Sequence, residues 1–297
     1  MRLKGTLICL CACAVLGGCA SSPYDGRLQA AAPKPVSAVY SHLNMKLRLF
    51  ATPNAPNRIA EIECSEFDCL ERRIARVGRR LADAALQLYP QLACELESFE
   101  FEIVDKAEPG TMSTALGRIV IQRPVEALAR NDAALGFIVA REMGHVIAQH
   151  HEENTAFGLI IGGLAQLLIP VTAVARVFSD MLFPGAATIS ASATVAANAS
   201  VKATSYMGSE TVVSVASKTQ QDEADEIAMR LLVHLGYDST LVLAAFAAVD
   251  LKTPPESWTK GLQNSLGRIA RTPEEAPKFI QTAAAESPEP AAASCPP

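Results

Sequence analysis

Helical periodicity dominates the chain and most constrains its fold. Between residues 70 and 88, apolar side chains recur every three or four positions, and Pro90 stops the run. The members of this stripe are Leu70, Ile74, Val77, Leu81, Ala85 and Leu88. Further helices are predicted over 131–151, where Asn131 or Asp132 can cap the first turn, and over 220–236, 240–252 and 258–269. Two short segments, 99–104 and 118–121, alternate as strands do.

Composition narrows the class of protein. The chain has 297 residues, and 49% are hydrophobic, which is enough to bury a core and excludes global disorder. The net charge of −5, without a block of Lys and Arg, argues against a nucleic-acid groove, which needs clustered positive charge. Aromatic residues make up 5%, which leaves little stacking surface for single-stranded nucleic acid. We therefore expect no nucleic-acid partner.

The first 18 residues have the pattern of a signal peptide. Arg2 and Lys4 form a short basic region, and the apolar residues 6–16 are too few to span a bilayer. The sequence Leu16-Gly17-Gly18-Cys19 follows, and it resembles the lipobox of bacterial lipoproteins. This resemblance implies that Cys19 is the lipidated mature N-terminus and that Ala20 directs the protein to the periplasmic side of the outer membrane. The alternative is an ordinary secretory signal with a cysteine at this position by chance.

Cysteine usage agrees with an oxidising compartment. After the signal region, the chain contains Cys64, Cys69, Cys94 and Cys295. Disulfides are permitted in the periplasm, and four cysteines allow three connectivities, among which the sequence does not choose. Cys295 lies in the C-terminal tail, so a pair within the other three is favoured. The alternative is that all four are isolated small hydrophobic residues.

Composition also divides the mature chain. Residues 19–60 are rich in Ala, Pro, Ser and Asn and are expected to form a tether and an irregular entry segment. Residues 61–282 form the predicted domain, with an apolar and low-complexity insertion at 156–216, and 283–297 form a tail that cannot pack. The stretch 156–175 contains no charged residue. It is expected to be a buried helix or a lid, with a membrane segment as the alternative.

Two segments carry most of the chemical information. The first reads Ala140-Arg141-Glu142-Met143-Gly144-His145-Val146-Ile147-Ala148-Gln149-His150-His151. The second reads Ser217-Lys218-Thr219-Gln220-Gln221-Asp222-Glu223-Ala224-Asp225, and Gly236-Tyr237-Asp238 follow it. In this order, and with the upstream segment 117–135, they resemble the metallopeptidases of family forty-eight, which include the HtpX-type heat-shock proteases and the CAAX prenyl proteases. The resemblance covers residues 65 to 250.

This resemblance implies a mainly helical domain of the α+β class with one small antiparallel sheet. It also implies a zinc site in which two histidines, one helical turn apart, bind the metal together with a distant glutamate. A glutamate between the histidines activates the metal-bound water. Here Glu142 stands at that general-base position and His145 at the second histidine. Asp225 matches an aspartate that orients the metal-binding groups.

The other two ligand positions have changed their chemistry. Arg141 replaces the first histidine and Gln221 the distant glutamate. A guanidinium keeps its positive charge at any physiological pH, and a catalytic zinc site needs three protein ligands. On one continuous helix, His150 and His151 lie about 140° and 240° round the axis from His145, so neither is expected on its face.

We therefore expect no zinc cofactor, and zinc only if unrecognised ligands take part. In place of the metal, an Arg141 guanidinium nitrogen is expected within about 4 Å of the Asp225 or Glu142 carboxylate. Gln221 is expected to contribute an amide donor to the same network.

The sequence favours a non-catalytic relative, a lipid-anchored envelope protein that binds polypeptide or an envelope partner. In the family, substrate lies as an extended strand beside a sheet edge, which needs no zinc, and the matching segment here is 110–117. The alternative is an active zinc metalloendopeptidase in envelope protein quality control. A third hypothesis is a structural protein with a vestigial peptidase fold. The expected partners are the membrane, through lipid on Cys19, and unfolded or envelope proteins.

Overall fold

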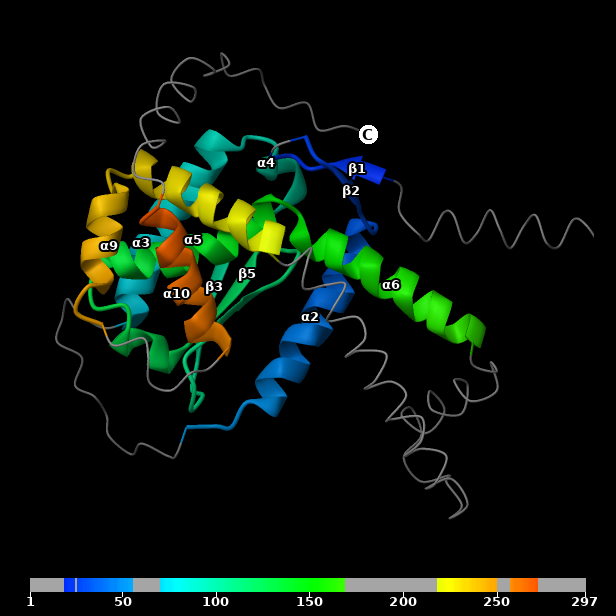
Figure 1. Cartoon of the computed structure of the whole chain (residues 1–297), viewed down its shortest axis with the longest axis horizontal. Helices are drawn as coiled ribbons and strands as arrows, with labels where there is room; N and C mark the ends of the chain where they lie inside the picture. Colours follow the sequence, from blue (N-terminus) through cyan, green and yellow to red (C-terminus); the bar gives the residue numbers. More distant parts are fainter. Residues whose placement is uncertain (1–18, 25, 56–69, 169–217, 250–256, 272–297) are drawn as a thin grey trace, which may run out of the picture. The chain divides into compact units, whose positions relative to one another are not determined.

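The computed structural model of the chain describes residues 19–24, 26–55, 70–168, 218–249 and 257–271. The chain divides into two compact units. The larger comprises Ser22–Arg27, Lys34–His151 and Gln220–Pro297, and the smaller comprises Met1–Ser21, Leu28–Pro33 and Glu152–Thr219. All expected site residues except Cys19 therefore lie in the larger unit. Figure 1 shows the helices and strands of the chain, coloured from the N-terminus to the C-terminus.

A three-stranded sheet lies at the centre of the larger unit. Its order is β3 (Glu100–Val104), β5 (Arg118–Gln122) and β4 (Thr111–Ser113). β3 runs parallel to β5, with Glu100 opposite Arg118, whereas β4 runs antiparallel to β5. The sheet is therefore mixed, which corrects the antiparallel sheet expected from the resemblance. The reason is that the chain leaves β3, forms the far edge strand β4, and turns back at Gly117, whose φ is +79°.

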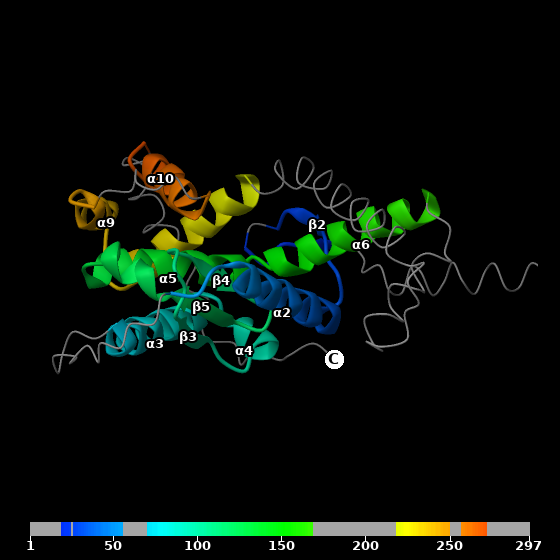
Figure 2. The ribbon, with the colours of Figure 1, turned by 90° about the horizontal axis from the view of Figure 1, so that it is seen from below.

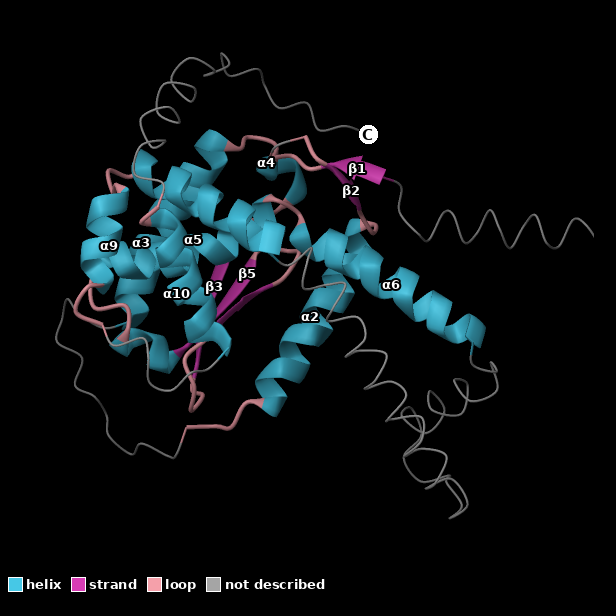
Figure 3. Cartoon of the chain, viewed as in Figure 1, coloured by secondary structure: helices cyan, strands magenta, loops and turns pink. Residues whose placement is uncertain are grey.

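Helices surround this sheet, as Figure 3 shows, and the α+β, mainly helical class is confirmed. α3 (Leu70–Leu88) buries the predicted apolar stripe. The short α4 (Leu92–Glu95) follows α3 along the chain, and the 3-10 helix η1 (Arg123–Ala127) follows β5. In Figure 2, α5 (Asp132–Ile147) lies between α3 and a second set of helices. This set comprises the helix Lys218–His234, α9 (Ser239–Phe246) and α10 (Ser257–Ile269).

α5 crosses the helix Lys218–His234 at very short range. A Cβ built on Gly144 would lie 2.6 Å from the carbonyl oxygen of Ala224 and 2.9 Å from its Cα. Only glycine permits this backbone approach, and real Cβ atoms essentially never lie under 3.0 Å from such neighbours. The crossing brings residue 141 of one helix beside residues 221 and 225 of the other, and so builds the candidate site.

The N-terminal part is more regular than the tether expected over 19–60. β1 (Cys19–Ser21) and β2 (Leu28–Ala30) form an antiparallel pair in the smaller unit. In the larger unit, the segment Ser22–Arg27 is attached to the helix Lys218–His234, because Arg27 Nε donates to Glu223 Oε1 at 2.8 Å. The helix α2 (Lys34–Ala51) follows. Ser37, Ser41 and Met45 recur at i, i+4 and i+8 and bury one face of this helix, a signal too polar to be recognised from sequence.

Several expectations concern residues outside the described ranges. These are the signal peptide 1–18, the cysteines at 64, 69 and 295, the low-complexity part of 156–216 beyond residue 168, and the tail 283–297. Cys94 is disulfide-bonded. The stretch 156–175 is helical as far as residue 168, within α6 (His150–Leu168).

In the described part of the chain, no single helix has the length and hydropathy needed to cross a membrane. One pair, the helix Lys218–His234 with α9, passes the test by length and composition, but the two are bent by 107°. The apolar residues of the first member, such as Ala224, Ile227 and Leu231, are fully buried inside the larger unit.

The Gly144 crossing predicts a large effect of one methyl group. Gly144→Ala should lower the free energy of unfolding by about 1–3 kcal/mol, because the two helices have to move apart. Gly261→Ala in α10 is the matched control, since a Cβ there meets nothing within 4 Å, and it should stabilise by about 0.5–1 kcal/mol. Urea unfolding of both variants checks this, and equal stabilities would contradict the tight crossing.

Candidate functional site

The site is built on one face of α5. Asn131 caps the helix by accepting a hydrogen bond from the Ala134 N–H at 2.9 Å, as predicted. From Ala134 to Ile147 every residue is buried except Glu142 and His145, which are half-buried. These two residues are three positions apart and therefore lie on the same face. The face that the sequence motif marks is thus the one part of α5 that is open to the site.

The predicted helix over 131–151 breaks before its end. α5 stops at Ile147, Gln149 adopts a left-handed φ of 57°, and α6 begins at His150. The break turns the chain back, so that the Nδ1 atoms of His150 and His145 lie 2.9 Å apart. This corrects the expectation that His150 stays away from His145, which assumed one continuous helix.

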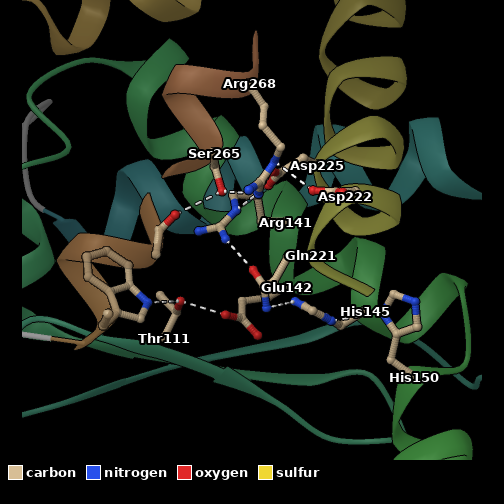
Figure 4. A network of polar contacts seen from close by, with 12 residues as sticks. Thr111, Arg141, Glu142, His145, His150, Gln221, Asp222, Asp225, Ser265 and Arg268 are labelled. Carbon is tan, nitrogen blue, oxygen red and sulfur yellow. Dashed lines mark hydrogen bonds and ion pairs between the residues drawn. The ribbon is translucent and has the colours of Figure 1, made fainter. Parts of the chain in front are cut away.

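A buried ion pair joins α5 to the helix Lys218–His234. Arg141 Nε donates to Asp225 Oδ1 at 2.7 Å, and the two side chains are only 8% and 6% exposed (Figure 4). The expected contact of Arg141 is therefore present. Arg268 of α10 binds the same carboxylate, with its Nε 3.0 Å from Oδ2, and also lies 2.9 Å from Asp222 Oδ1. Two guanidinium groups thus face two carboxylates, which balances the charge.

Gln221 links this ion pair to His145. Arg141 Nη2 donates to Gln221 Oε1 at 2.7 Å, so the amide oxygen accepts at this contact. The amide Nε2 lies 3.2 Å from His145 Nε2. Because an amide nitrogen only donates, His145 Nε2 must accept, and its Nδ1 carries the proton.

The same logic extends to Glu223. His145 Nδ1–H donates to His150 Nδ1, and His150 Nε2 then donates to Glu223 Oε2 at 2.8 Å. One direction of donation therefore runs through the five side chains Arg141, Gln221, His145, His150 and Glu223, which we call the polar relay. Arg27 closes it by donating to Glu223 from the other side.

Electrostatics agree with a neutral His145 ring at the middle of the relay. Burial, with His150 and Arg141 close by, holds the pKa of His145 well below its usual range. At Glu223, burial alone would raise the pKa, but the hydrogen bonds from His150 and Arg27 outweigh it and lower the pKa. The relay thus ends on an ionised carboxylate that accepts from two sides.

Glu142 is held by the edge strand β4. Its Oε1 accepts from the Thr111 hydroxyl at 2.7 Å and its Oε2 from the Ser113 hydroxyl at 2.9 Å. Trp258 of α10 donates its indole N–H to Thr111 Oγ1 at 3.0 Å. His151 Nε2 lies 3.0 Å from Ser113 Oγ, and burial together with His150 and Arg48 lowers the pKa of His151 to about 3. Both carboxylate oxygens of Glu142 therefore already accept hydrogen bonds from protein.

The residues present do not fit the zinc site that the sequence resemblance implies. His145 is the one retained ligand, and its Nε2 lies toward the other two ligand positions. This nitrogen faces the Gln221 amide. Arg141 is a permanent cation at the second position, and Gln221 at the third offers an oxygen that already accepts from Arg141. Within the described residues, no group of three or more His, Cys, Asp or Glu side chains could hold a metal ion.

Sequence reasoning found the two helices of the site but not all its members. The structure brings together Glu142, His145, Arg141, Gln221 and Asp225, as the motif spacing implied. It adds Arg268, Thr111, Ser113, His150 and Glu223. The two hydroxyl residues sit in the segment 110–117 that the family comparison had marked as the sheet edge. No sequence signal singled out Arg268, which lies 43 residues after Asp225.

Comparison with known proteins gives one match. Residues 70–282 match the profile described as Peptidase family M48, which covers most of the chain. No curated protein matches the sequence.

The ion pair predicts a loss of stability when Arg141 is removed. Arg141→Ala should lower the free energy of unfolding by about 2 kcal/mol, because Asp225 loses one of two guanidinium partners and the Gln221 oxygen loses its donor. Arg76→Ala is the control. It removes an exposed ion pair to Asp132, in which the Arg76 side chain is 49% exposed, and should cost less than about 1 kcal/mol. Chemical denaturation measures both, and a neutral Arg141→Ala would contradict the buried ion pair.

The lowered pKa values of His145 and His151 predict acid sensitivity. Below about pH 6.5, the unfolded chain protonates these histidines while the folded chain resists it, so the unfolded state binds more protons. The free energy of unfolding should then fall by up to about 1.4 kcal/mol per pH unit for each residue, and for His151 down to about pH 3. Above pH 7 this dependence should vanish. His151→Gln should flatten the slope between pH 6.5 and 4.5 in urea titrations, and an unchanged slope would refute the assignment.

Proposed function

Because the chain belongs to peptidase family M48, whose members are zinc metallopeptidases, we propose that it is a non-catalytic relative that binds polypeptide without cleaving it. On this proposal it is an envelope lipoprotein, anchored through lipid on Cys19 at the periplasmic side of the outer membrane. Its clients are unfolded or envelope proteins.

One observation carries the proposal, namely the occupation of the metal-ligand positions by the Arg141–Asp225 ion pair and the polar relay. A zinc ion needs an electron pair from each ligand, but Arg141 has none to offer and Gln221 directs its oxygen at Arg141. The positive charge of the guanidinium, buried beside Asp225, does the electrostatic work that a metal would do. Hydrogen bonds between side chains of this one chain therefore stabilise the site.

The edge strand β4 supports polypeptide binding. Gly110 O accepts from Gln122 N and Thr114 N donates to Arg118 O, so the even-numbered residues of this strand bond to β5. In an antiparallel pair the backbone groups of the alternate residues, Thr111 and Ser113, therefore point to the other side. An extended polypeptide can add there as a further strand, through main-chain hydrogen bonds that need no metal. The Glu142 carboxylate fixes both hydroxyl side chains of this strand.

The experiment compares metal content and proteolysis across four proteins. The wild type should purify without stoichiometric zinc and should not degrade unfolded casein. Arg141→His and Gln221→Glu as single changes should behave alike, because each leaves one ligand position changed. The double variant restores three ligand positions and should bind about one equivalent of zinc, measured by plasma mass spectrometry.

Two results bear directly on the proposal. One equivalent of zinc in the wild type, with casein cleavage that a chelator abolishes, would overturn it in favour of an active zinc metalloendopeptidase. Retention of casein on the immobilised wild type, lost in Ser113→Pro, which removes an outward-pointing backbone donor from β4, and kept in Ser113→Ala, would support polypeptide binding at this edge.

A further inference from the structure

Helix α2 carries most of the exposed apolar surface of the described residues. Nine large hydrophobic side chains are exposed in this part of the chain, and five of them lie on α2. They are Val39, Tyr40, Leu43, Leu47 and Phe50. At 100° per residue, these five side chains fall within an arc of about 100°, which we call the α2 apolar face. Contiguous exposed apolar surface of this kind marks an interaction site.

The α2 apolar face lies opposite the side by which the helix is attached. Ser37, Ser41 and Met45 are buried, and the Ser41 hydroxyl accepts a hydrogen bond from the Ala115 N–H, just after β4, at 3.0 Å. In Figures 1 and 2, α2 lies beside β4, at the rim of the larger unit. The apolar face is therefore not needed to complete the core and is directed away from it.

The charges of α2 indicate what covers this face. The helix contains no Asp or Glu, although the chain as a whole has a net charge of −5. Lys46 is exposed, lies about 20° from the edge of the apolar arc, and forms no ion pair with a described residue, whereas Arg48 lies on the attached side of the helix. A helix with an apolar face, a basic residue at its edge and no acidic residue has the pattern of one that lies in the plane of an anionic membrane surface.

We propose that the α2 apolar face docks on a lipid bilayer, with Lys46 at the anionic headgroups. The proposal deepens the proposed function, because the expected lipid on Cys19 lies only fifteen residues before Lys34 and keeps α2 near the same membrane. A lipid on Cys19 alone leaves the domain free to rotate about its attachment to the membrane. With α2 as a second contact, the orientation of the domain on the membrane is fixed. Through Ser41 and Ala115, the membrane contact also fixes the edge strand β4.

The test uses the mature chain with Cys19→Ser, exported behind a cleavable signal so that it carries no lipid. Its probe is a vesicle of phosphatidylethanolamine and phosphatidylglycerol, compared with a vesicle of phosphatidylcholine alone. The protein should float with the anionic vesicles, and Leu43→Asp with Leu47→Asp should weaken the partition coefficient on the order of tenfold or more. Lys46→Ala should weaken it about fivefold, and high salt should remove this difference.

Leu241→Asp is the matched control, because Leu241 is 50% exposed on α9, comparable to Leu43 at 54%, and should leave flotation unchanged. Circular dichroism verifies that each variant folds. Absence of flotation, or equal flotation of the Leu43/Leu47 and Leu241 variants, would overturn the proposal. A concentration-dependent dimer that the Leu43/Leu47 change abolishes, without vesicle binding, would overturn it in favour of a second copy of the chain. The assay depends neither on a lipid attached to Cys19 nor on proteolysis. Failure of membrane docking is therefore distinct from failure of the proposed function.

Discussion

The buried ion pair between Arg141 and Asp225 joins three helices of the domain at one point. Arg141 comes from α5, Asp225 from the helix Lys218–His234, and Arg268 of α10 binds the same carboxylate. A carboxylate that is nearly removed from water is costly unless charge and hydrogen bonds compensate it. Here two guanidinium groups do so, and the aromatic ring of Phe137, one turn before Arg141, lies 5.9 Å from the Arg141 Cζ. These charged side chains thus hold the three helices together at this point.

This arrangement changes what the site offers to a ligand. In a metallopeptidase, the general-base glutamate must be free to take a proton from metal-bound water. Glu142 instead accepts from two hydroxyls of the edge strand, and so it stiffens that strand. The strand in turn contacts α2 through Ser41. Polypeptide binding at β4 and membrane docking at α2 would therefore act on one connected piece of structure.

The sequence predicted the helices of the domain better than the breaks between them and the contacts that they make with one another. Long stripes such as that of α3, and the cap at Asn131, follow from local spacing, so their helices were found. The break at Gln149 was missed, because a left-handed residue that is neither Gly nor Asn gives no sequence signal. His150 consequently entered the site unpredicted. Arg268 was missed for a different reason, since its partner Asp225 is set by how α10 packs, and no local pattern encodes a contact across 43 residues.

The single direction of donation through the polar relay has an evolutionary consequence. Each member can accept from one neighbour only if it donates to the next, so reversing one amide or one ring would place two donors, or two acceptors, face to face. A substitution at residue 221 therefore changes which side chains are tolerated at residues 145 and 150. Among descendants of this chain, these positions should change together or not at all, even though His150 lies on α6 and not on the two helices that carry residues 141 and 221. The hydrogen bonds of the relay, in this way, make the identity of residue 150 matter.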